Sequence, residues 1–406
     1  MKKLLLLSFS VICAMVMSAF LLPNIKKVNS LPDNMVVTYS DVNKVNNDDE
    51  YSAFINFELP KNVNASTNGE LAETVMSIKL FNLFTIKKVN VRLLVDTDVY
   101  VGGETVGFNL YSDGVICVGS NAVVTSSGTK EPIKDSGIKE GDAIIKIENI
   151  EIETIEDVDR IINLPNFAGK QIRLTIKRAN EEKEVEVLPV FDMFSQKYKL
   201  GLWVRNSASG VGTLTYVKQS DFRFGAVGHP IVDNSLGENF EVENGNIYKC
   251  SLLGIKKGEK NNPGEIRSSI NLSDDAIGFA DTNCKYGVYG NILNKSFIDA
   301  EKTATLGGRL SVELGDAKIY CALDNEGVKG YDVKIIKANK QNSPDDKSMI
   351  IKVTDKELLE KTGGIIQGMS GSPIIQNGKL IGAVTHVFLN DPTRGYGVYV
   401  DWMLDN

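Results

Sequence analysis

A short run near the end of the chain has the residue types that nucleophilic catalysis needs. Residues 368–373 read Gly-Met-Ser-Gly-Ser-Pro. Ser370 can supply an attacking oxygen, and the backbone N–H groups of Gly368 and Ser370 can point together at the oxyanion of a tetrahedral intermediate. Gly, Ser and Pro are also the commonest turn residues. The six letters alone therefore leave an acyl-transfer site and an ordinary turn equally open.

A serine hydroxyl needs a neighbouring base, and histidine is rare in this chain. The sequence holds two histidines, His229 in a Gly-His-Pro run and His386, sixteen residues after Ser370. The apolar stretch 222–227 predicts a strand that ends just before His229. We expect His229 to be the general base and His386 to be a packing residue in the wall of the cleft.

The carboxylate that orients the base is harder to choose. Three aspartates follow His229 at the spacing typical of an acid in the same half of the fold, namely Asp274, Asp275 and Asp281. Asp355, fifteen residues before Ser370, gives the order base, acid, nucleophile. It also begins a short predicted helix, with Thr354 as the N-cap and the glycines 363–364 at its end. From the residues alone, both assignments remain open.

The segment that must position these groups, residues 195–406, has the pattern of antiparallel sheet. Short apolar runs alternate with glycine and asparagine pairs, and Asn377-Gly378 between two apolar runs predicts a tight hairpin. This pattern is typical of a pair of antiparallel β-barrels. We expect His229 in the first barrel and Ser370 in the second.

Residues 96–194 predict a smaller α+β unit. Thr154 and Asp157 form a capping box before an apolar helical face that stops at Pro165, and a strand follows at 172–176. With the run SGIKEGDAI at 136–144, this succession resembles a PDZ domain of the bacterial protease-associated kind. The resemblance implies a loop whose backbone N–H groups hold a peptide terminus, formed by Val106, Gly107, Phe108, Asn109 and Leu110. Beside it, a groove would accept an added strand.

The N-terminal segment predicts export. Lys2 and Lys3 precede an uncharged apolar run of nineteen residues, 4–22, and Pro23 follows. Residues 1–22 fit either a cleaved signal peptide or an uncleaved membrane anchor. Residues 23–95 predict a polar lead-in followed by a small strand-containing unit.

Composition argues against several classes of protein. The net charge is −7, the pI is near 5.2, and no Lys/Arg cluster interleaves with aromatic residues, so nucleic-acid binding is not expected. Neither histidine lies at ligand spacing from a cysteine, so we expect no metal site, and the chemistry above needs no cofactor. Four widely spaced cysteines beyond the apolar run allow three pairings, among which the sequence does not choose: Cys117, Cys250, Cys284 and Cys321.

Three segments together resemble the stage IV sporulation protein B (SpoIVB) family, PDZ-containing serine peptidases of endospore-forming bacteria. They are GHPIVD at 228–233, KKGEKNNPGE at 256–265 and the run from 362 to 404 that includes GMSGSP. The resemblance implies that His229, Asp355 and Ser370 act together. It therefore favours Asp355 over the three aspartates suggested by spacing.

The resemblance also implies a biological role. Members of the family are exported into the space between the two forespore membranes and cleave themselves. They also cleave a membrane-anchored regulator, SpoIVFA in the best-known lineage, and so trigger late mother-cell sigma-factor activation. Expected partners are this regulator, the chain itself and a peptide ligand of the PDZ domain, with self-cleavage expected in residues 24–60. The alternative is a non-catalytic envelope binding protein with a degenerate peptidase domain.

Overall fold

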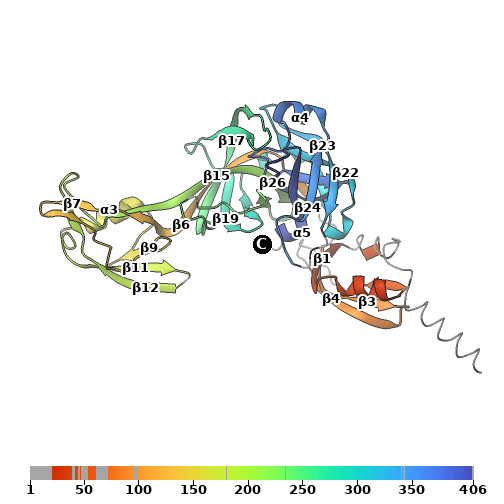
Figure 1. Cartoon of the computed structure of the whole chain (residues 1–406), viewed down its shortest axis with the longest axis horizontal. Helices are drawn as coiled ribbons and strands as arrows, with labels where there is room; N and C mark the ends of the chain where they lie inside the picture. The colour runs from red at the N-terminus through yellow and green to blue at the C-terminus, as the bar shows by residue number, and fades with distance from the viewer. Residues whose placement is uncertain are drawn as a thin grey trace, which may run out of the picture.

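The computed structural model describes residues 21–38, 42–43, 46, 54–60, 72–94, 98–179, 181–233, 235–339, 341 and 343–404. Most of the expected signal or anchor, and much of the polar lead-in, lie outside these residues. Within the described part, no helix is long and apolar enough to cross a membrane. Figure 1 shows three parts in a row, with a PDZ-like unit at one end, a pair of barrels in the middle and a small N-terminal unit at the other end.

The N-terminal unit confirms the expected small strand-containing module. A helix at 21–29 packs through Val28 on a four-stranded sheet whose order is β1-β4-β3-β2. The strands are β1 (Asn34–Thr38), β2 (Ile55–Glu58), β3 (Ala72–Leu80) and β4 (Phe84–Leu94). Alternate residues of the long β3–β4 hairpin, such as Met76 and Val91, are buried against the helix side of this sheet.

The first barrel closes, among the described residues, through the strand cycle β6-β15-β16-β20-β19-β17 and back to β6. Its core includes the rings of Phe108, Phe224 and Phe240, all buried. The bounds are β6 (Thr105–Ser120), β15 (Leu202–Lys218), β16 (Arg223–Ala226), β17 (Asn244–Lys256), β19 (Gly278–Cys284) and β20 (Gly287–Ile292); β18 (Glu265–Ile270) extends β17 as a hairpin and the 3-10 turn η1 spans Lys295–Phe297.

The second barrel closes in the same way through β22-β23-β24-β27-β26-β25 and back to β22. The expected mainly β, double-barrel architecture is therefore confirmed. The two barrels are joined by β5 (Asp98–Val101), which pairs with β15 and with β21 (Thr303–Leu306). The remaining bounds are η2 (Arg309–Ser311), β22 (Gly315–Ala322), β23 (Val328–Ala338), β24 (Met349–Val353), α4 (Lys356–Thr362), β25 (Pro373–Gln376), β26 (Lys379–Val387), β27 (Arg394–Tyr399) and α5 (Val400–Met403).

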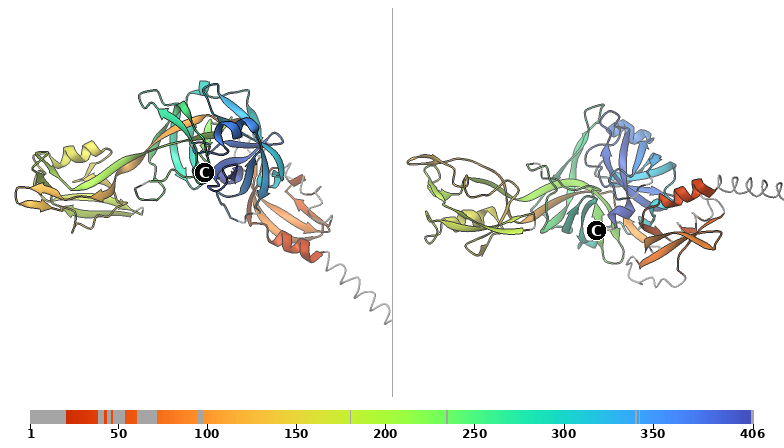
Figure 2. Two further views of the ribbon diagram at one scale, coloured as in Figure 1. Left: turned by 45° about the horizontal axis from the view of Figure 1, so that its top comes forward. Right: turned by 60° about the horizontal axis from the view of Figure 1, so that its bottom comes forward.

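The PDZ-like unit is inserted between β6 and β15, two paired strands of the first barrel. Strands β6 and β15 pair from Thr105–Thr213 in the barrel to Ser120–Leu202 in the far unit, which Figure 2 shows as two long ribbons. The peptidase barrel thus begins before the PDZ unit along the chain, whereas the sequence suggested one domain after the other. The unit adds β7 (Val123–Thr125), β8 (Gly128–Lys130), β9 (Ala143–Ile147), β10 (Ile150–Glu151), α3 (Ile155–Ile162), β11 (Ile172–Arg178), β12 (Glu181–Val187), β13 (Val190–Asp192) and β14 (Lys197–Lys199).

The expected carboxylate-binding loop at Val106, Gly107, Phe108, Asn109 and Leu110 is not a loop. These residues form the barrel half of β6, which pairs with β15 on one edge and with β17 on the other. The side chains at positions 106, 108 and 110 are fully buried in the first barrel. Because both edges of the strand are occupied, its N–H groups are not free to hold a peptide terminus, and the prediction was wrong.

Local sequence signals were read more accurately than this long-range pairing. The Thr154 hydroxyl accepts the N–H of Asp157 and the Asp157 carboxylate accepts the N–H of Thr154, which completes the capping box of α3. Asn377 and Gly378, with φ of 51° and 77°, turn β25 into β26 as a tight hairpin. The cap of α4 is shifted by one residue from expectation, because Asp355 rather than Thr354 is its N-cap.

Candidate active site

The loop from Gly368 to Pro373 enters β25 from the seam between the two barrels. Its tightest point is Gly371, which has φ +96° and lies against the first barrel. A Cβ at this position would stand 2.1 Å from the Thr213 carbonyl oxygen and 2.4 Å from the Val227 nitrogen. No side chain fits there, so glycine lets Ser370 approach the first barrel.

The amides proposed for the oxyanion hole are free in the described part of the chain. Neither Gly368 N–H nor Ser370 N–H donates a hydrogen bond there. The carbonyls in the same peptide planes are held: Gln367 O accepts from Ile266 N at 2.8 Å and Met369 O accepts from Ser372 N at 2.9 Å. Because each plane is rigid, these two bonds fix the directions of the free N–H groups.

Strand β15 holds the nucleophile loop from the side of the first barrel. Thr213 N–H donates to Ser370 O at 2.8 Å and the Thr213 hydroxyl donates to Gly368 O at 2.7 Å. The Thr215 hydroxyl donates to Gly371 O, also at 2.7 Å. Both threonines are fully buried, so these bonds are shielded from water and set the position of the loop.

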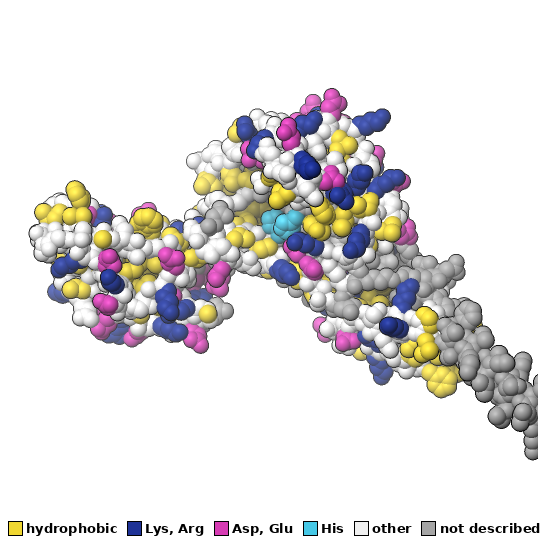
Figure 3. Space-filling model, in the orientation of Figure 1, with side chains coloured by type: hydrophobic (Ala, Val, Ile, Leu, Met, Phe, Trp, Pro, Cys, Tyr) yellow, Lys and Arg dark blue, Asp and Glu magenta, His cyan; other side chains and the backbone are white. Residues whose placement is uncertain are grey.

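The two histidines meet at this loop. His229 follows β16 of the first barrel, and its ring centroid lies 5.1 Å from that of His386 on β26 of the second barrel. The Ser370 hydroxyl donates to the carbonyl of Thr385, the residue just before His386, at 2.7 Å. Figure 3 shows the histidines together, in cyan, on the open face between the barrels. The structure therefore places the two histidines side by side, with His386 next to the residue whose carbonyl accepts the Ser370 hydroxyl.

Two features prepare His229 to act as a base. Its Nδ1 lies 2.9 Å from the carbonyl oxygen of Pro230, and a proton on Nδ1 that donates to this oxygen leaves Nε2 unprotonated. Burial lowers the pKa of His229 below its ordinary value, with the Pro230 carbonyl and then the charge of Asp346 acting in the opposite direction. The ring is therefore neutral at neutral pH.

The structure does not bring Asp355 to either imidazole. Its carboxylate accepts the N–H of Leu358, which caps α4, and the N–H of Asp332. It follows β24, whereas Asp346 precedes that strand and lies at its other end, with Oδ2 3.8 Å from His386 Nδ1. Burial lowers the pKa of both histidines, and Asp346 is the carboxylate whose charge opposes that shift in each.

The aspartates suggested by spacing are occupied elsewhere. Asp281 forms a bidentate pair with Arg223, at 2.9 and 3.0 Å, and Asp274 accepts from the side chain of Asn271. Asp275 has no contact with the histidines among the described residues. Asp346 was missed because it lies in the polar stretch Asn-Ser-Pro-Asp-Asp-Lys-Ser, where nothing local distinguishes it from a solvated loop.

The PDZ unit has a groove at a different place from the one expected. The residues Leu202–Arg205 of β15 pair with β6 on one edge, and no described strand pairs with their other edge. Helix α3 lies along this edge: Asn206 Nδ2 donates to Glu153 O before the helix, and Asn163 at its end bonds both backbone groups of Tyr198. A free strand edge beside a helix is the geometry that accepts an added peptide strand. The signal in the sequence was the apolar-Gly-apolar run at 200–203.

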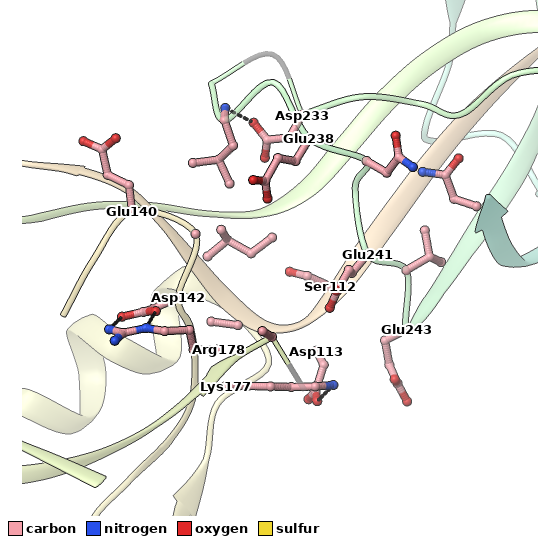
Figure 4. Close-up of a pocket in the computed structure, with 18 of the residues that line it drawn as sticks. Ser112, Asp113, Glu140, Asp142, Lys177, Arg178, Asp233, Glu238, Glu241 and Glu243 are labelled. Atoms are coloured by element: carbon pink, nitrogen blue, oxygen red, sulfur yellow. Dashed lines mark hydrogen bonds and ion pairs between the residues drawn. The ribbon is translucent and has the colours of Figure 1, made fainter. Parts of the chain in front are cut away.

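A cavity of about 710 Å³ separates this unit from the loop that follows His229 (Figure 4). On the PDZ side Arg178 binds Asp142 at 2.6 Å. The other wall belongs to the barrel loop and is acidic, with Glu238, Glu241 and Glu243. Neither histidine nor Ser370 lines the cavity, so it lies beside the active site and does not contain it.

Comparison with known families decides the class of protein. The model of the SpoIVB peptidase S55 family matches residues 196–404, just over half of the chain. The chain belongs to this family. The S55 peptidase also carries a PDZ domain, whose family model matches residues 102–188. It is therefore a serine peptidase with a PDZ domain, as the resemblance implied.

Solved structures and curated proteins add little to this assignment. The active form of the Rv3671c protease from M. tuberculosis is similar to the S55 peptidase with a TM-score of 0.26 and 14% identity, over 49% of this chain and 72% of that one. The inactive form gives a TM-score of 0.25 and 14% identity, over 48% and 81%. No curated protein matches the chain.

The clamp from Thr213 predicts a specific kinetic defect. Thr213→Val should lower kcat by about 10- to 100-fold, because the Gly368 carbonyl loses its donor and the loop drifts from its productive position. Thr213→Ser keeps the hydroxyl and should stay within a few-fold of the parent. Peptide hydrolysis and thermal melting of both variants measure this. A valine variant that melts earlier but keeps its kcat would limit the bond to stability.

The contacts of the two aspartates predict different effects on the pH profile. In the parent enzyme kcat/KM should fall as pH drops through a pKa below about 6.5, because burial disfavours the charged form of His229. Asp346→Asn removes a charge that raises this pKa, so the acid limb should move to still lower pH. Asp355→Ala should lower stability by about 1 kcal/mol through the lost cap of α4 and leave the acid limb in place. The opposite pattern would restore Asp355 as the acid that orients His229.

Proposed function

We propose that the S55 peptidase is an exported endopeptidase of sporulation signalling that uses Ser370 as nucleophile and His229 as general base. The observation that supports this assignment is that His229 lies beside His386, and that the Ser370 hydroxyl, on a loop with two free amides, donates to the residue just before His386. Membership of the SpoIVB family supports the signalling role.

In the structure the Ser370 hydroxyl is hydrogen-bonded to the backbone, and the reaction must begin from this state. Ser370 Oγ–H donates to Thr385 O, so the side chain must rotate about its Cα–Cβ bond before it can give its proton to His229. The oxygen then attacks the peptide carbonyl, and the amides of Gly368 and Ser370 receive the negative charge. His229 passes the proton to the leaving amine, and water hydrolyses the acyl-enzyme with the same base.

The imidazolium that forms in these steps needs a partner for each of its N–H groups. Nδ1–H has the Pro230 carbonyl, which is neutral and fixes the ring without a carboxylate. Asp346 supplies a negative charge that acts on both rings, and its Oδ2 lies 3.8 Å from Nδ1 of His386. We propose that this arrangement serves the purpose for which the family resemblance suggested Asp355.

The PDZ groove is a second binding site of the proposed function. Its free edge, Leu202–Arg205, is the beginning of the strand that holds the nucleophile loop through Thr213. An extended peptide added to this edge would therefore bind to an element that reaches the active site. We propose that such a peptide, from a substrate or from another copy of the chain, regulates cleavage.

The substrates are proposed from the family. A membrane-anchored regulator such as SpoIVFA, and the polar segment 24–60 of the chain itself, are the candidates, and the site of action is the space between the forespore membranes. The long apolar run at 4–22 supports delivery to that compartment.

Loss of the nucleophile tests the proposed chemistry. Ser370→Ala should abolish labelling by a fluorophosphonate and lower kcat by about 10⁴- to 10⁶-fold. Ser372→Ala is the matched control in the same loop, because its buried hydroxyl has no hydrogen-bond partner among the described residues and its removal leaves the contacts of Ser370 intact. Equal labelling of the Ser370→Ala variant and the parent would favour the non-catalytic binding protein.

Peptide binding at the groove should change the reactivity of Ser370. Trp203 on β15 is 60% exposed, so its fluorescence should report peptides with a free apolar C-terminus. At saturation, the rate of fluorophosphonate labelling should change several-fold, because the peptide binds the strand that clamps the loop. Trp203→Phe is the optical control. Binding without any change in labelling rate would show that the groove only recruits substrate.

A further inference from the structure

The β3–β4 hairpin of the N-terminal unit ends in an exposed apolar tip. The tip reads Phe81-Asn82-Leu83-Phe84, and the side chains of Leu83 and Phe84 are 75% and 64% exposed. Phe54 adds a further exposed ring, 5.0 Å from the ring of Phe81. Large apolar side chains gathered at one surface point usually mark an interaction site, so this tip needs a partner.

The tip lies at the same end of the unit as the exit of the N-terminal apolar run. That run ends at Leu22, which is 62% exposed in the helix 21–29. Figures 1 and 2 show this helix and the β3–β4 hairpin extending in the same direction, away from the barrels. Figure 3 shows apolar side chains at this outer end of the unit.

Leu22 and the hairpin tip extend by similar distances from the point where the helix and β4 are linked. The far end of the helix is tied to β4, since Lys87 Nζ reaches the Leu31 carbonyl oxygen. From Asn29 back to Leu22 the helix rises by about 10 Å at 1.5 Å per residue. From Lys87 back to Phe84 the strand also covers about 10 Å at 3.3 Å per residue. A surface reached by Leu22 is therefore reached by the tip as well.

Basic residues border this end of the unit. Lys26 on the helix and Lys88 on β4 are exposed, and neither has an acidic partner among the described residues. Lysines beside apolar and aromatic side chains suit the headgroup layer of an anionic membrane, where the rings enter the boundary and the ammonium groups stay at the phosphates. This chemistry favours a lipid surface over a protein as the partner.

We propose that the hairpin tip, Phe81–Phe84, inserts into the surface of the membrane that the N-terminal run enters, with Lys26 and Lys88 at the headgroups. The proposal rests on the membrane attachment of residues 1–22 and is independent of the peptidase chemistry. Two points of contact, the run and the tip, hold the N-terminal unit in one orientation. A single flexible tether would leave the barrels free to turn.

Fluorescence quenching by brominated lipid tests the insertion. The full chain with Leu83→Trp is reconstituted in phosphatidylcholine–phosphatidylglycerol vesicles with and without brominated acyl chains, and the signal of the unmodified chain is subtracted. Trp at position 83 should lose at least half of its emission to the brominated lipid. Leu253→Trp is the matched control, because Leu253 is 70% exposed on β17 of the first barrel, and it should not be quenched.

The outcomes separate the parts of the proposal. A Trp at position 83 that is unquenched and emits as in water overturns membrane insertion. Quenching that is equal in vesicles without phosphatidylglycerol overturns the role of the lysines. The same measurement on the Ser370→Ala chain should give the same quenching. Peptidase activity that is retained in this variant, with quenching intact, would contradict only the proposed catalytic residues.

Discussion

Thr213 makes the contacts on which the rest of the active site depends. Its N–H and its hydroxyl bind two carbonyls of one loop, those of Ser370 and Gly368, across the seam between the barrels. Each barrel closes on its own core, so the site exists only as long as the seam holds. The free amides, the glycine at 371 and the meeting of the histidines all follow from this fixed approach of the second barrel to β15.

The position of Thr213 also explains why the PDZ unit belongs to the catalytic domain. The strand that carries Thr213 begins at the free edge of the PDZ groove. Its partner β6 runs antiparallel to it, from the barrel to the PDZ unit. The pairing of the two strands shifts register between Trp203 and Val204 and again between Arg205 and Ser207. The groove and the clamp on the nucleophile loop nevertheless lie on one strand and are not separated by a linker.

The sequence was informative wherever the signal was local. The Ser370 loop, the position of His229 after a strand, the capping box of α3 and the hairpin at Asn377-Gly378 each follow from a few neighbouring residues. The strand at Val106–Leu110 was misread because its partners, β15 and β17, lie about a hundred or more residues further along the chain. The cap at Asp355 and the charge at Asp346 are equally polar in sequence, and only the fold places one of them at the histidines.

The insertion of the PDZ unit also determines when the enzyme can form. During synthesis β6 emerges long before β15, and the nucleophile loop follows later still, so the first barrel stays open until the PDZ unit has been made. Pairings of such high contact order form slowly. A newly synthesised chain therefore passes through an interval in which its PDZ unit is complete and its peptidase is not.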